Sequence, residues 1–139
     1  MRKLKLILLS FLAFNLNAQK KAVENEKLIA CLNEPKFLSW FDICRKENDT
    51  VYIYDNIGKF ENFTSTNVTC GKLVMLKKSS LEINVNRSNL NCDDKIVVYK
   101  IEIIKGKSKL SFINICTNAQ MVIELDSKNK VVNYSTGIF

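Results

Sequence analysis

The chain contains no histidine, and this absence restricts the chemistry available to it. Histidine is the commonest general acid or base in enzymes, and it activates the nucleophile in Ser-His-Asp and Cys-His systems. It is also a frequent zinc ligand, and no two cysteines have the C-x-x-C spacing of a structural zinc site. We therefore predict a non-enzymatic protein with no catalytic residue, no cofactor and no bound metal.

Long apolar runs are also scarce, and the longest one lies near the N-terminus. The first five residues carry three positive charges, and residues 6–14 are apolar except for Ser10. This run is too short to cross a bilayer, which takes about 20 residues, but it matches the apolar region of a secretory signal peptide. Because Ala18 supplies a small residue at the cleavage point, we predict a signal peptide over residues 1–18 and a single domain over residues 19–139. This prediction places the mature chain outside the cell or in the periplasm.

Charge of one sign is not concentrated in any part of the chain. Loss of the first 18 residues removes three basic residues and no acidic one, so the formal net charge falls from +7 to +4. The remaining basic residues are spread along the sequence instead of clustering as they do in nucleic-acid-binding proteins. No later apolar segment is long enough to span a membrane. We expect no nucleic-acid partner and no membrane span in the mature chain.

Five cysteines follow the predicted cleavage point. In an oxidising compartment, the cysteines of a small exported domain usually form disulfides. An odd number allows at most two bridges within the chain and leaves one thiol, which is able to join two copies as a disulfide-linked dimer. The sequence does not rank the pairings, so all five residues are disulfide candidates: Cys31, Cys44, Cys70, Cys92 and Cys116.

The N-terminal part of the predicted domain has a helical pattern. Apolar residues recur with a period near 3.6 over residues 20–32, which predicts an amphipathic helix that ends before Pro35. The aromatic segment after Pro35 fits either a second short helix or a strand, and we favour the helix. Its aromatic side chains are expected to belong to the core, and the alternative is an apolar pocket formed by Phe37, Trp40, Phe41 and Tyr99.

The rest of the chain has the composition of β-strands. Short polar turns, such as the one at Gly106, separate the later strands and force antiparallel neighbours, which predicts a terminal β-meander. Alternation also predicts that Val97, Tyr99, Ile101 and Ile103 share one face. Residues 62–69 also have β character, and the predicted strands cover residues 50–54, 72–76, 81–85, 95–104, 110–117, 121–125 and 131–136.

These elements predict an α+β fold, in which one or two N-terminal helices pack on a bent antiparallel sheet of about six or seven strands. The order of elements resembles that of cystatin-like and nuclear-transport-factor-2-like domains in architecture only, and no motif accompanies the likeness.

Two functions fit these features. The first is a secreted or periplasmic binding or interaction protein, whose partner is an unknown exported protein or a small ligand. The second is a small apolar-ligand carrier, or an enzyme that works without histidine, with a pocket on the concave face of the sheet.

Overall fold

The computed structural model describes most of the predicted domain. The described residues are 19, 23–60, 63–80, 83 and 94–138. The predicted signal peptide lies outside them. So does the strand predicted over residues 81–85, apart from Ile83, which is not part of a strand.

Within the described residues, two α-helices and a short 3-10 helix precede the sheet. The N-terminal helix is described over residues 23–32 and buries Leu28, Cys31 and Leu32, whose spacing places them on one helical stripe. Helix α2 (Pro35–Trp40) begins at the proline. Proline is favoured at the first helical position because a backbone N–H there makes no hydrogen bond within the helix, so its absence costs nothing. The 3-10 helix η1 (Ile43–Arg45) follows. The second short helix is therefore confirmed, and the alternative strand is not formed.

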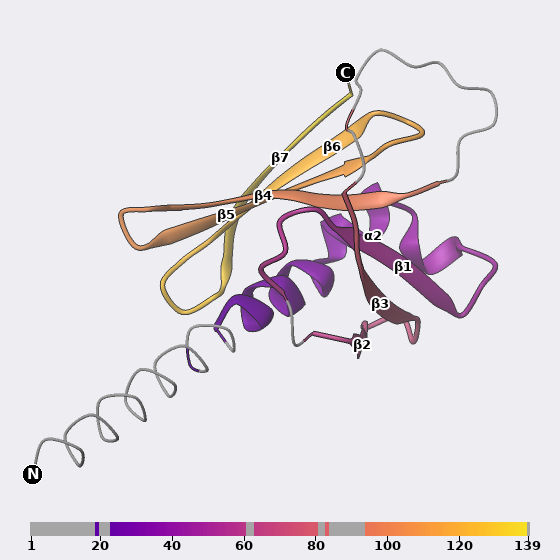
Figure 1. Cartoon of the computed structure of the whole chain (residues 1–139), viewed down its shortest axis with the longest axis horizontal. Coiled ribbons are helices and arrows are strands. Elements are labelled where there is room, and N and C mark those ends of the chain that lie inside the picture. Colours follow the sequence, from indigo (N-terminus) through magenta and orange to yellow (C-terminus); the bar gives the residue numbers. More distant parts are fainter. Residues whose placement is uncertain (1–18, 20–22, 61–62, 81–82, 84–93, 139) are drawn as a thin grey trace, which may run out of the picture.

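Seven strands of the described chain form one sheet, in the order β2-β3-β1-β4-β5-β6-β7. Figure 1 shows the helices on one side of this sheet, so the molecule has two layers. The α+β prediction and the terminal antiparallel meander from β4 to β7 are confirmed. The strands are β1 (Thr50–Asp55), β2 (Ser65–Asn67), β3 (Leu73–Lys78), β4 (Ile96–Ile104), β5 (Lys107–Asn114), β6 (Ala119–Leu125) and β7 (Val131–Ile138).

The sheet is not entirely antiparallel, because β1 runs parallel to both of its neighbours. Its residue Ile53 pairs with Leu76 of β3 on one side and with Ile96 of β4 on the other. The connections from β1 to β3 and from β3 to β4 are long enough to return the chain in the same direction. The prediction of antiparallel neighbours rested on short turns, and these join β2 to β3 and the strands of the meander but do not join β1 to either of its neighbours.

A β-bulge in β4 changes which side chains face the core. The register with β5 shifts between Val98 and Lys100, so the alternation is interrupted there. Val98 before the bulge and Ile101 after it both face the core, opposite Phe112 and Leu110 of β5, so Val97 and Ile101 lie on opposite faces of β4. The prediction that the odd-numbered residues from Val97 to Ile103 share one face is therefore wrong.

The core lies between the helices and the sheet. A buried carboxylate at its margin, that of Asp55, accepts hydrogen bonds from the backbone N–H groups of Ile57, Gly58 and Phe60 at 2.8, 2.9 and 3.3 Å. These bonds fix the turn after β1, where Gly58 has a φ of 70°. The largest fully buried side chains include Leu28, Leu32, Phe37, Ile43, Ile53, Phe60, Ile96, Leu110, Phe112, Met121 and Ile123.

Candidate functional site

Two of the four aromatic residues proposed to line a pocket belong to the core. Phe37 is fully buried and Phe41 is 3% exposed. The ring of Phe37 packs against Phe41 with 4.9 Å between centroids, and against Phe112 of β5 with 4.8 Å in an edge-on arrangement. These contacts join α2 to the centre of the sheet, so both rings fill space between the layers instead of enclosing an empty volume.

The other two candidates lie elsewhere. Trp40 is 36% exposed at the end of α2, and Tyr99 is half-buried at the bulge of β4. None of the three surface hollows described below is lined by any of the four aromatic residues. None of these three hollows therefore brings the four residues together.

The structure assigns different roles to the cysteines. Cys44 and Cys70 form a disulfide, and Cys116 is also disulfide-bonded. Cys31 is the free thiol of the described residues, and it is fully buried in the N-terminal helix. Burial, assisted by the nearby charge of Glu34, raises the pKa of the Cys31 thiol far above its ordinary value. A disulfide-linked dimer through Cys31 requires this helix to leave the sheet, so the burial argues against such a dimer.

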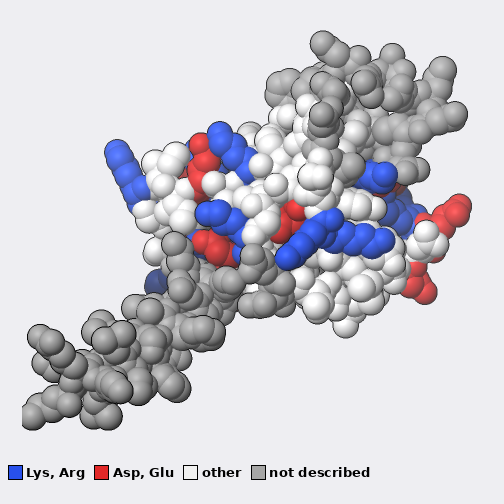
Figure 2. Space-filling view, viewed as in Figure 1, with Lys and Arg blue, Asp and Glu red and all other residues white. Residues whose placement is uncertain are grey.

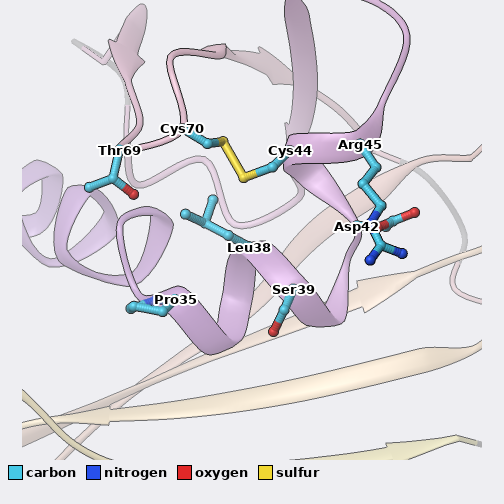
Figure 3. A pocket seen from close by; sticks show the side chains of 8 residues that line it. All are labelled: Pro35, Leu38, Ser39, Asp42, Cys44, Arg45, Thr69 and Cys70. Atoms are coloured by element: carbon cyan, nitrogen blue, oxygen red, sulfur yellow. A yellow bond between two sulfur atoms is a disulfide. The ribbon is translucent and has the colours of Figure 1, made fainter.

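An open hollow of about 430 Å³ lies beside the Cys44–Cys70 disulfide. Figure 3 shows the bridge at its rim, with Leu38 of α2 pointing toward the two sulfur atoms. The turn after β2 contributes Thr69 and Cys70, and the segment from α2 to η1 contributes all of the other lining residues. The disulfide therefore joins the two segments that form this hollow.

Two opposite charges lie on one side of this hollow. The guanidinium of Arg45 is 3.8 Å from the carboxylate of Asp42, and both side chains are largely exposed. Asp42 has a φ of 53°, a left-handed conformation that aspartate tolerates better than most residues. This exposed ion pair contributes little to stability, but it makes the rim polar.

Two further hollows have mixed linings. One of about 560 Å³ lies beside Tyr52 and Tyr54 of β1, where Lys46 pairs with Asp94. The ammonium group of Lys77 lies 3.7 Å from the centroid of the Tyr52 ring and so occupies one of its faces. The other, of about 460 Å³, lies between the N-terminal helix and the turns of the meander. Neither combines an apolar wall with a few convergent polar groups, as ligand pockets usually do.

Strand β7 forms one edge of the sheet and is exposed along nearly its whole length. It pairs with β6 on one side, and no strand of the described chain pairs with its other side. Six of its eight residues are exposed, and the other two are partly exposed. Figure 1 shows β7 at the outer margin of the meander. Its outer row of main-chain N–H and C=O groups is therefore open to pairing.

No residue of β7 carries a charge, and none is proline. Proteins usually protect an edge strand with charged residues, prolines, bulges or short length. The opposite edge of the sheet is protected by length, since β2 has three residues. β7 has only a register shift at its start, opposite Glu124 and Leu125. Its remaining residues form an unprotected edge.

The two faces of β7 differ in chemistry. Tyr134 lies opposite the core residue Ile123, so it points to the helix-covered side of the sheet, where it is 41% exposed. Ile138, at an alternate position on the same side, is 75% exposed. Asn133 lies opposite Glu124 and points to the other side. Thr136 lies between Tyr134 and Ile138 on the same side, so one side of the edge is mainly apolar and the other is polar.

The described residues contain no group of three or more side chains suited to hold a metal ion. None of the helices described is long and apolar enough to cross a membrane. Figure 2 shows basic and acidic side chains interspersed over the face that it presents, without a broad area of one sign.

Comparisons of the chain with models of protein families, with curated proteins and with solved structures find no match.

The sequence alone does not identify β7 as a candidate site. The signal was present, because residues 131–138 contain no charged residue although 25% of the whole chain is charged. An uncharged strand can equally lie in the centre of a sheet, however, so its meaning depends on the strand order. Only the structure supplies that order.

Proposed function

We propose that the mature chain is an exported, non-enzymatic binding protein, and that it binds an extended segment of another exported polypeptide along the free edge of β7. One observation carries the proposal: β7 is an eight-residue edge strand without a charge, and its two faces are largely exposed. Addition of a strand to such an edge provides main-chain hydrogen bonds for affinity and side-chain contacts for specificity.

The difference between the faces of β7 limits the partner sequence. On the helix-covered side, a partner strand meets Tyr134 and Ile138, which favour aromatic or β-branched neighbours across the strands. On the other side it meets Asn133 and Ser135, which favour small polar neighbours. The proposed partner is therefore a segment whose apolar and polar residues alternate, with few charges.

Export of the chain is part of the same proposal. The described Cys44–Cys70 bridge is compatible with an oxidising compartment, and the leader over residues 1–18 has the pattern of a signal peptide. The alternative of an apolar-ligand carrier or an enzyme receives no support from the described hollows, since none is lined by the aromatic residues suggested for it.

Site-specific photo-cross-linking tests the proposal. A photoreactive phenylalanine analogue replaces Tyr134 in one variant, and in a matched control it replaces Tyr52, an equally exposed tyrosine on the interior strand β1. The variants are expressed in the cells that make the protein, and the exported fraction is irradiated. We expect a discrete adduct with another polypeptide from position 134 and none from position 52.

Two other results are possible. Equal labelling from both positions, or no adduct from position 134, contradicts the proposal. An adduct of twice the chain mass from position 134 alone replaces the foreign partner with a second copy of this chain.

A further inference from the structure

The Cys44–Cys70 disulfide is exposed at both of its residues. Cys44 lies in η1, and Cys70 lies in the turn after β2. The other described cysteines are less accessible, since Cys116 is half-buried and Cys31 is fully buried. Among the cysteines that the structure describes, reagents in solution therefore reach Cys44 and Cys70 most easily.

We infer that the Cys44–Cys70 disulfide is a site of thiol–disulfide exchange, at which an external dithiol reduces this bridge while the rest of the fold persists. Attack on a disulfide requires an open path to one of its sulfur atoms. The hollow of about 430 Å³ beside the bridge provides that path, because the disulfide lies at its rim (Figure 3).

The exchange has two steps. A thiolate of the external dithiol attacks the sulfur of Cys44 or Cys70, the bond between the two cysteines breaks, and the sulfur that is not attacked leaves as a thiolate. The second thiol of the reagent, after losing its proton, then attacks the reagent's sulfur in the mixed disulfide and releases the other cysteine. The dithiol is oxidised to a disulfide by two electrons, and Cys44 and Cys70 become thiols with the two protons that the reagent loses.

The charges at the site favour an anionic reagent. Arg45 follows Cys44 directly and lines the same hollow, so a positive charge lies close to the path of the thiolate. The carboxylate of Asp42, at 3.8 Å, offsets part of this charge. Because both side chains are largely exposed, we expect a modest effect that weakens in salt.

Opening the bridge lowers the stability of the domain but leaves the other contacts of the two joined segments in place. The segments that it joins keep separate apolar anchors in the core, namely Leu38 and Ile43 on one side and Val68 on the other. The meander from β4 to β7 lies beyond β1 in the sheet and does not depend on the bridge for its pairing. Reduction should therefore loosen the turn after β2 without unfolding the sheet.

Timed reduction of the mature protein tests the inference. Native protein is treated with dithiothreitol, free thiols are blocked with N-ethylmaleimide at intervals, and peptides are mapped by mass spectrometry. We expect Cys44 and Cys70 to be labelled at least about tenfold faster than Cys116, because exposure controls access to the sulfur. We expect Cys31 to stay unlabelled and the far-ultraviolet circular dichroism to be unchanged. Labelling of Cys44 and Cys70 no faster than Cys116, or loss of secondary structure when they are reduced, would overturn the inference.

A charge reversal tests the role of Arg45. At low ionic strength we expect Arg45→Glu to slow the reduction of the bridge about threefold or more, and we expect the difference to shrink in high salt. The control is Lys128→Glu, which makes the same change of charge in the exposed turn between β6 and β7. Equal rates in the two variants would contradict the role given to Arg45.

Discussion

At the scale of single residues, the burial of Cys31 decides how the odd cysteine behaves. The number of cysteines predicted one free thiol but not its position, because position depends on which side chains the fold covers. The N-terminal helix places Cys31 on the stripe that faces the sheet, between Leu28 and Leu32. The free cysteine is thus a core residue and not a surface group.

The raised pKa of Cys31 predicts a loss of stability at high pH. The unfolded chain loses the thiol proton near the ordinary pKa of 9.0, whereas the folded chain keeps it, so folding stability is fully present below that pH and falls above it. The contribution of this one group is at most about 1.4 kcal/mol per pH unit. Urea unfolding at pH 8, 9 and 10 measures it. We expect Cys31→Ala to be less stable than the unmodified chain at pH 8, but to lose less stability between pH 9 and 10. Parallel profiles of the free energy of unfolding against pH for the two proteins would contradict this.

Asp55 provides a second residue-level prediction. We expect Asp55→Ala to lower the free energy of unfolding by about 1–3 kcal/mol, because three backbone N–H groups lose a buried acceptor. Asp55→Asn keeps one carbonyl oxygen and should recover part of the loss. Asp126→Ala is the control, since Asp126 accepts two backbone hydrogen bonds in an exposed turn and should cost less. Urea denaturation measures the free energy of unfolding of each variant. A larger loss of this free energy in Asp126→Ala than in Asp55→Ala would contradict the prediction.

At the scale of elements, the aromatic cluster of α2 divides into a core part and a surface part. We expect Phe37→Ala to destabilise the protein by about 3–5 kcal/mol, because it removes a fully buried ring that contacts Phe41 and Phe112. Trp40→Ala should cost about 1 kcal/mol, because Trp40 is partly exposed. Thermal unfolding of the two variants measures both effects. Similar small losses would instead favour the alternative, in which these side chains line a pocket.

The strands show where sequence patterns succeed and where they fail. Short turns, as at Gly106, identified the antiparallel meander because a tight connection leaves the chain no other direction. The parallel pairing of β1 followed no local pattern, since it depends on how long connections return. The bulge between Val98 and Lys100 was also missed, because it is fixed by pairing with β5 and not by the residues of β4 alone.

The candidate site was missed for the same kind of reason. A strand becomes an open edge only through its place in the sheet, and β7 ends the sheet because no later strand of the described chain covers it. The sequence supplied the absence of charge in β7, and the topology supplied the exposure. The proposed binding edge needs both.

At the scale of the whole molecule, the two ends of the sheet differ: a disulfide constrains the chain near one end, and a free edge strand lies at the other. Near one end, the Cys44–Cys70 bridge closes a loop with a sequence separation of 26 residues, which is worth about 3–4 kcal/mol by restricting the unfolded chain. The other end presents β7 without a covalent constraint. The disulfide suits a domain that stays folded in an oxidising compartment. The free edge of β7 suits a domain that binds another polypeptide in that compartment.

Export into that compartment is the claim on which the other proposals depend, and peptide mapping of the protein recovered from its producing cells under non-reducing conditions tests it most directly. We predict a mature N-terminus at Gln19, a peptide pair joined through Cys44 and Cys70, and an unmodified Cys31. Recovery of the chain inside cells, with its leader attached and all five cysteines reduced, would contradict the account.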